Sequence, residues 1–154
     1  MEKGAYVGNF AEVKGSKIGS GTKIGHFSYT GDTTIGENSN IGAGMVICNY
    51  NGAEKFKTKI GNNVFVGSNS TIVAPCEIED KSFIGGGSVI TKKVEKYSLA
   101  LGRERQTNIE NWGLVKGLWQ DDSVVDKKLK KTGKQHAKKV IADKAKEDNK
   151  KSKK

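Results

Sequence analysis

The sequence of 154 residues has only one proline, two cysteines and no long apolar run. Two cysteines cannot form a disulfide framework, which excludes cysteine-stapled secreted domains and favours a reducing cytoplasm. Cys48 and Cys76 both fall where we expect small apolar side chains. No segment approaches the roughly 18 apolar residues that cross a bilayer, and the N-terminus lacks the apolar region of a signal peptide. We therefore expect a cytoplasmic protein without membrane insertion.

Lysines far outnumber acidic residues at the C-terminal end. The net charge is +10, and residues 113–154 carry 14 lysines against 6 acidic residues, so the remainder is nearly neutral. Aromatic residues are missing after Trp119, which leaves no stacking platform for bases and argues against nucleic-acid binding. Low hydrophobicity and Gly133 predict a Lys-rich, partly helical or disordered tail that increases solubility.

Glycine, by contrast, is frequent and regularly placed. An aliphatic residue, often followed by glycine, recurs about every six residues from 7 to 94, with a small residue four positions later. A period of six does not match the α-helix, and the abundant β-branched residues favour strands. Each hexad therefore predicts one short strand and one turn, and three hexads predict one coil of an all-β, parallel β-helix.

The six-residue period is interrupted, and the interruptions help to locate a site. The longest contains residues 49–58, where Asn51-Gly52 predicts a turn in a protruding loop. Residues 96–112 are expected to close the last coil, which gives a domain at 4–112 and a basic tail at 113–154. The breaks lie between Val13 and Ile18, between Thr30 and Ile35, and between Ile47 and Ile60.

His26 is the only histidine among the repeats and precedes the break at Thr30. A lone histidine is usually an ordinary surface residue, but a neutral imidazole can also act as a general base. A single histidine cannot supply the three imidazoles of a β-helix metal site, so we expect no metal. Gly42-Ala43-Gly44 could present backbone N–H groups to an oxyanion, or could simply form a tight corner. Winding of the chain should bring several polar residues to one edge, namely Glu12, Lys14, Tyr29, Asn40 and Asn49.

Four segments together resemble one family of hexapeptide-repeat transferases. They are GNFAEVKGSKIGSGTKIGHFSYTGD, NIGAGMVICNYNGAEKFKTKIG, VFVGSNSTIVAP and LGRERQ. From about residue 4 to 112 they resemble the C-terminal acetyltransferase domain of the bacterial bifunctional N-acetylglucosamine-1-phosphate uridyltransferase/glucosamine-1-phosphate acetyltransferase. The resemblance implies a left-handed parallel β-helix that forms a homotrimer, with active sites between subunits. It does not extend to the uridyltransferase domain, which is absent, nor to the coil upstream of Gly4 that carries a phosphate-binding arginine.

The resemblance also implies the reaction and the residues that serve it. Acetyl-CoA would acetylate the amine of glucosamine 1-phosphate, giving N-acetylglucosamine 1-phosphate for UDP-N-acetylglucosamine and cell-envelope synthesis (peptidoglycan and lipopolysaccharide). The catalytic residues would be His26 as base, Asn49 at the reacting amine, and Glu12 to orient the base. The sugar phosphate would be bound by Lys14, and the sugar by Tyr29 and Asn40. The coenzyme would be bound by Ala43, Asn49, Tyr50, Ser68, Gly86 and Arg103.

Three alternatives remain open from the sequence. The chain could be a hexapeptide acyltransferase with another amino acceptor, or a truncated, non-catalytic trimeric scaffold. It could also be either a fragment of a longer protein or a reduced acetyltransferase. Loss of the upstream arginine, one charge-assisted contact, would weaken substrate binding by roughly 1.5–3 kcal/mol.

Overall fold

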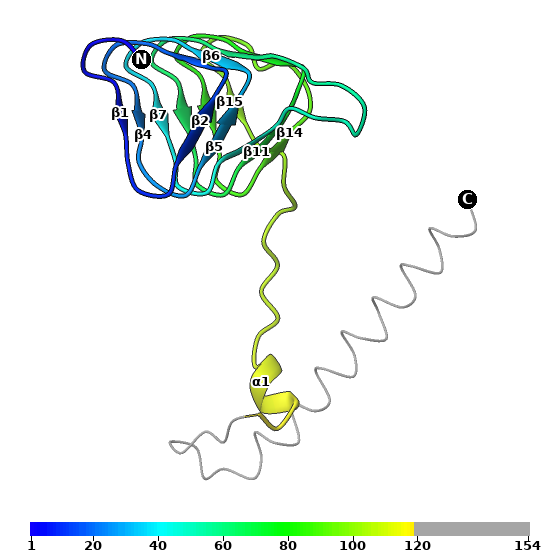
Figure 1. Ribbon diagram of the computed structural model, residues 1–154. Helices are drawn as coiled ribbons and strands as arrows, with labels where there is room; N and C mark the ends of the chain where they lie inside the picture. Colours follow the sequence, from blue (N-terminus) through cyan, green and yellow to red (C-terminus); the bar gives the residue numbers. More distant parts are fainter. Residues whose placement is uncertain (119–154) are drawn as a thin grey trace. The chain divides into compact units, whose positions relative to one another are not determined.

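The computed structural model describes residues 1–118, so most of the predicted basic tail lies outside the described residues. The chain divides into one unit at Met1–Glu104 and another at Arg105–Lys154. In the first unit, short strands stack in three parallel sheets as the chain winds around a common axis (Figure 1). The all-β, parallel β-helix predicted from the hexads is therefore confirmed. The domain boundary predicted at residue 112 stays a prediction.

The three sheets form three faces, which we name A, B and C. Face A contains β1 (Tyr6–Val7), β4 (Lys23–Ile24), β7 (Asn40–Ile41), β10 (Phe65–Val66), β13 (Phe83–Ile84) and β15 (Leu99–Ala100). Face B contains β2 (Glu12–Lys14), β5 (Tyr29–Gly31), β8 (Val46–Cys48), β11 (Thr71–Val73) and β14 (Val89–Ile90). Face C contains β3 (Lys17–Ile18), β6 (Thr33–Ile35), β9 (Thr58–Ile60) and β12 (Cys76–Ile78). The second unit contributes α1 (Trp112–Val115).

The aliphatic residue of each hexad points inward, as predicted. On face A, Ile24 pairs with Ile41, and Ile41 with Val66, and all three side chains are at most 2% exposed. Burial of such stacked side chains is the main stabilising term for strands too short to be stable alone. Thr30 occupies one aliphatic position on face B beside Val13 and is fully buried. The core is thus continuous along the axis, but at position 30 it contains a hydroxyl group in place of an aliphatic side chain.

The small residues of the hexads have a second role that their size alone did not indicate. The Thr22 hydroxyl donates to the Gly36 carbonyl at 2.7 Å, and the Ser39 hydroxyl donates to the Gly61 carbonyl at 3.0 Å. Both acceptors are corner residues of the following coil. Buried polar groups need such partners, so serine and threonine at these positions join consecutive coils.

The three interruptions of the hexad period fall at one corner. We call this corner BC, because each interruption separates a strand of face B from the next strand of face C. Two coils turn there with one residue fewer, and the third carries the predicted loop, which protrudes from the stack (Figure 1). The loop closes on itself where the Phe56 N–H donates to the Asn49 carbonyl at 2.8 Å. The Asn51 side-chain oxygen accepts from the N–H groups of Ala53 and Glu54, so the predicted turn is confirmed.

Two smaller expectations are refined by the structure. The closing segment adds β15 to face A, and the Leu101 side chain covers Gly85 on the last coil. Both cysteines are free, but Cys48 is exposed, because its pairing with Val73 places it on the outward side of face B. The prediction of a small apolar position was therefore wrong for Cys48. Within residues 1–118 no helix is long and apolar enough to cross a membrane.

Candidate active site

His26 lies at the corner between faces A and B, which we call corner AB. The residues two positions beyond the inward residue of face A stack there in consecutive coils. Their carbonyl groups accept hydrogen bonds from the next coil: Gly44 N–H to His26 at 3.2 Å, Asn69 N–H to Ala43 at 2.8 Å, and Gly87 N–H to Ser68 at 2.8 Å. The structure therefore brings the predicted base and the predicted coenzyme-binding backbone into one column of corner residues, namely His26, Ala43, Ser68 and Gly86.

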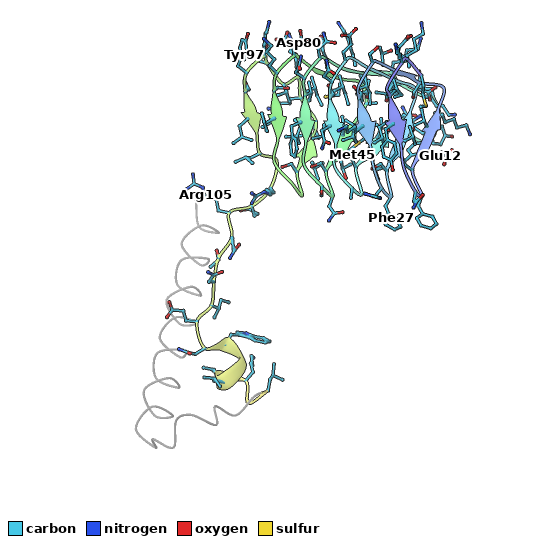
Figure 2. All side chains as sticks on the ribbon, turned by 90° about the vertical axis from the view of Figure 1, so that its left-hand side faces the viewer. Glu12, Phe27, Met45, Asp80, Tyr97 and Arg105 are labelled. Carbon is cyan, nitrogen blue, oxygen red and sulfur yellow. The ribbon has the colours of Figure 1, made fainter. Side chains whose placement is uncertain are left out.

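The backbone N–H groups of this column differ from those at the corner between faces C and A, called corner CA. There, side-chain oxygens of Asn62, Asp80 and Glu79 accept from the N–H groups of Glu37, Asn62 and Lys96 at 2.8, 2.8 and 3.0 Å. Figure 2 shows Asp80 and Phe27 on opposite edges of the stack, one at each corner. At corner AB the N–H groups of the last three column residues have no hydrogen-bond partner within residues 1–118. They are available to a carbonyl oxygen or an oxyanion.

Gly102 continues the column beyond the last complete coil, and Arg103 directly follows it, in the same row as Gly87. It follows β15, and a Cβ on Gly87 would lie 4.0 Å from the Arg103 Cδ atom. The Gly102 carbonyl accepts from the Val89 N–H at 3.0 Å, which attaches this segment to the coil below. The Arg103 side chain therefore passes beside Gly87, and its guanidinium group is exposed. The N–H groups of a guanidinium can donate two parallel hydrogen bonds to phosphate oxygens.

A second group of predicted residues gathers on face B. Glu12 pairs with Tyr29, and Lys14 pairs with Gly31, in adjacent strands. A Cβ on Gly31 would lie 2.5 Å from the Tyr29 hydroxyl and 2.7 Å from the Asn49 Nδ2 atom. The phenol and the amide thus meet over a glycine that leaves them room, one strand away from Lys14.

Asn49 and Tyr50 begin the protruding loop but differ in burial. Asn49 is only 5% exposed, and its Nδ2 group donates to Asp32 Oδ2 at 2.6 Å. Tyr50 is exposed, and its hydroxyl donates to the Gly52 carbonyl at 2.5 Å. Asp32 was missed from the sequence, although it ends the segment GNFAEVKGSKIGSGTKIGHFSYTGD and lies within the break between Thr30 and Ile35.

Two predicted residues are not joined to these groups by contacts within the chain. Asn40 lies on face A, exposed, and pairs with Lys23 and Phe65. No hydrogen bond links Glu12 to His26 in the described part of the chain. In one chain the predicted residues therefore form two groups, one at corner AB and one toward the corner BC end of face B. Among residues 1–118 there is no group of three or more His, Cys, Asp or Glu side chains suited to a metal ion.

The chain matches two family models of the same kind. "Bacterial transferase hexapeptide (six repeats)" matches residues 57–92, and "Hexapeptide repeat of succinyl-transferase" matches residues 15–49. Among curated proteins, the chain is similar to the "Bifunctional protein GlmU" of Stutzerimonas stutzeri, with 55% identity over 108 residues. It is also similar to the protein of that name from Streptococcus uberis, with 53% identity over 112 residues. These matches cover 70% and 73% of this chain but only 24% of each relative, so the chain spans about a quarter of their length.

A solved structure has the same fold. It is a mutant of perosamine N-acetyltransferase from Caulobacter crescentus in complex with CoA and GDP-perosamine, with a TM-score of 0.50 and 16% sequence identity. The likeness covers 66% of this chain and 52% of that chain, and it concerns the fold alone. In its repeats, its parallel β-helix and its sequence, the chain is similar to the hexapeptide-repeat transferases and to the GlmU proteins.

Proposed function

We propose that the chain transfers an acetyl group from acetyl-CoA to the amine of glucosamine 1-phosphate, giving N-acetylglucosamine 1-phosphate. The observation that carries this proposal is the column at corner AB. A histidine there shares one edge with three backbone N–H groups that have no partner within residues 1–118, while Lys14, the Tyr29 hydroxyl and Asn49 gather toward the corner BC end of face B. In this proposal the first group would supply a base and oxyanion donors, and the second group would supply polar groups for an acceptor.

His26 would act as the general base. Its side chain is exposed at the corner, where an incoming amine can reach it. The imidazole accepts a proton from the amine while the nitrogen lone pair forms a bond to the thioester carbonyl carbon. The carbon–sulfur bond then breaks, and the thiolate leaves and takes up a proton.

The remaining corner residues fit the acetyl donor. The N–H groups of Ala43, Ser68 and Gly86 can donate to a thioester oxygen and to amide carbonyls laid along the axis. Arg103, beside Gly87, can pair with phosphates at the far end of such a donor. Tyr50, exposed at the start of the loop, would also contact the donor.

The amino-sugar phosphate would be bound from face B. Lys14 supplies a cation for the phosphate, and Tyr29 and Asn49 supply a phenol and an amide for the sugar and its amine. The predicted sugar contact of Asn40 arises from face A, so we propose that a second copy of the chain completes the site. Face A also carries a stacked, exposed pair, Phe65 and Phe83, with ring centroids 5.3 Å apart, which favours contact with another copy in a homotrimer.

The proposal predicts thiol release from acetyl-CoA that depends on glucosamine 1-phosphate. Replacement His26→Ala should reduce kcat by at least about 100-fold, because general-base catalysis contributes that much. The measurement is thiol release under saturating substrates, with mass spectrometry of the acetylated sugar.

Two controls sharpen this experiment. A panel of other amino sugars and amines tests the acceptor, and equal rates with all of them would contradict the assignment of glucosamine 1-phosphate. Replacement Lys59→Ala is the control, because Lys59 lies on face C, away from the proposed site. It removes an exposed cation whose Nζ atom lies 3.3 Å from Glu77 Oε1. Its rate should equal the original rate, whereas His26→Ala with an unchanged rate would contradict the proposed base.

A further inference from the structure

Asp32 stands at corner BC in an unusual backbone conformation. Its φ is +49°, in the left-handed region, although it is not glycine. Its N–H donates to the Lys14 carbonyl at 2.9 Å, which secures the corner to the preceding coil. Asp and Asn tolerate this region better than most residues, but it still carries a cost that the surrounding contacts must offset.

The same residue bonds to both ends of the protruding loop. At the start of the loop, Asn49 donates from Nδ2 to the Asp32 carboxylate at 2.6 Å. At the end of the loop, the Thr58 N–H donates to the Asp32 backbone carbonyl at 3.3 Å. Asp32 therefore connects three consecutive coils, since Lys14, Asp32 and the loop ends each belong to a different coil.

Two glycines leave the space that this pair occupies. A Cβ on Gly15 would lie 2.8 Å from Asp32 Oδ1, and a Cβ on Gly31 would lie 2.7 Å from Asn49 Nδ2. Contacts at these separations do not occur around a real Cβ, so a side chain at either position would displace the carboxylate or the amide. The corner is shaped around the Asp32–Asn49 pair.

The chemistry of the pair decides which end of the Asn49 amide remains free. A carboxylate only accepts hydrogen bonds, whereas an amide has both a donating NH₂ group and an accepting oxygen. Asp32 therefore selects the NH₂ group of Asn49 and leaves the amide oxygen for a different donor. Because Asn49 is 5% exposed, water competes little for this arrangement.

We infer that Asp32 is a positioning residue that presents the Asn49 amide oxygen to an N–H of the acceptor amine. This inference rests on the proposed acetyl transfer. When the Asn49 amide oxygen accepts a hydrogen bond from one N–H of the amine, the orientation of the amine is fixed. The nitrogen lone pair then points toward the thioester carbon. Correct orientation of a nucleophile contributes to kcat more than to substrate binding.

Replacement Asp32→Asn tests this role at nearly constant volume. An amide at position 32 can bond to either end of the Asn49 amide, so the selection is lost while the space stays filled. We expect kcat to fall between about 10-fold and 100-fold, with the KM for acetyl-CoA unchanged. A full rate in Asp32→Asn, while His26→Ala is inactive, would overturn the inference and leave the proposed function standing.

A double-variant cycle separates orientation of Asn49 from a general effect on the loop. If Asp32 acts through Asn49, adding Asp32→Asn to Asn49→Ala should cause no further loss of kcat. If the kcat loss of the double variant instead equalled the product of the two single losses, the inference would be overturned. Replacement Asn51→Ala is the matched control, because it removes two hydrogen bonds from the same loop without touching Asp32. If Asn51→Ala reproduced the kcat loss of Asp32→Asn, a loop effect would explain both and the inference would fail.

A readout without turnover tests the pair itself. In ¹⁵N-edited NMR spectra, the side-chain NH₂ signal of Asn49 is assigned by its loss in Asn49→Ala. In the unmodified chain this NH₂ group should be protected from hydrogen exchange with water. It should lose that protection in Asp32→Asn and keep it in Asn51→Ala. Unchanged protection in Asp32→Asn would overturn the inference. A protected signal in a chain that does not acetylate glucosamine 1-phosphate would count against the proposed function instead.

Discussion

Thr30 shows how one residue can depart from the pattern around it. Its side chain is fully buried in an aliphatic position, and its hydroxyl has no hydrogen-bond partner within residues 1–118. A buried hydroxyl without a partner costs free energy, while a valine of the same shape would not. Thr30→Val is therefore expected to raise the free energy of unfolding by about 1–2 kcal/mol, measured by urea denaturation.

The control for this prediction is Thr71→Val on the same face. Thr71 points outward between Val46 and Val89 and is half-buried, so its hydroxyl can reach solvent. Its replacement should change the free energy of unfolding by less than about 0.5 kcal/mol. Destabilisation by Thr30→Val would mean that the Thr30 hydroxyl makes a stabilising contact.

At the scale of single residues, the sequence could predict positions better than contacts. The spacing of the hexads placed Thr30 in the core correctly, and the four segments that resemble the acetyltransferase domain contain every proposed site residue except Gly86. The contact between Asp32 and Asn49 could not be predicted, because it joins residues 17 positions apart across a corner with an irregular turn. The repeat predicts which residues pair between neighbouring coils only where the six-residue period is unbroken.

At the scale of elements, carboxylates at corner CA accept hydrogen bonds from backbone N–H groups that have no backbone partner. Glu79 pairs with Lys93 at 2.7 Å and accepts from the Lys96 N–H, while Asp80 accepts from the Asn62 N–H. These contacts lower the pKa of both carboxyls, chiefly through Lys93 for Glu79 and through the Asn62 N–H for Asp80. Both carboxyls are partly exposed, so solvent screens much of their contribution.

The sign of this effect gives a prediction about acid stability. A carboxyl with a lowered pKa in the folded state contributes stability above its ordinary pKa, near 4.5 for Glu79 and 3.8 for Asp80. That contribution is lost as the pH falls through the folded pKa. In the double variant Glu79→Gln, Asp80→Asn, the free energy of unfolding should decline less steeply between about pH 5 and pH 2.

Urea denaturation across that pH range provides the measurement. Glu37→Gln is the control, because it removes a carboxyl from the same corner whose side chain makes no hydrogen bond or ion pair within residues 1–118. An identical slope in the double variant and the unmodified chain would show that the corner carboxylates do not contribute.

The elements themselves were predictable because their cause is local. A β-branched residue every sixth position can point inward only in a coil of three short strands. The stacking of all three interruptions at corner BC was not predictable from each one alone, since it depends on the register between coils. The contrast between capped N–H groups at corner CA and free ones at corner AB likewise appears only after the coils are stacked.

At the scale of the whole molecule, the placement of Asn40 and His26 leads to a prediction about assembly. Asn40 lies on face A, whereas His26 lies at corner AB before β5 of face B. If two copies supply the two residues to one site, co-expressed His26→Ala and Asn40→Ala chains should regain activity. In a closed homotrimer that contains both variants, one of the three sites combines an intact His26 with an intact Asn40, so about a third of the original kcat/KM would be restored.

The measurement compares the mixed trimer, purified by two different tags, with each variant alone. Sedimentation establishes the number of subunits in each sample. Activity equal to the average of the two separate variants would mean that one chain supplies both residues, and would contradict a site shared between copies.

The column at corner AB also sets a length. Neighbouring coils are separated by the strand spacing of about 4.8 Å, so His26 and Arg103, four coils apart, lie about 19 Å from each other along the axis. A donor that engages both ends must therefore combine a reactive group and an anionic group at that separation. In the proposed acetyl transfer, the number of coils between them determines which acyl donors fit, and adding or removing one coil would change that fit without altering His26 or Arg103.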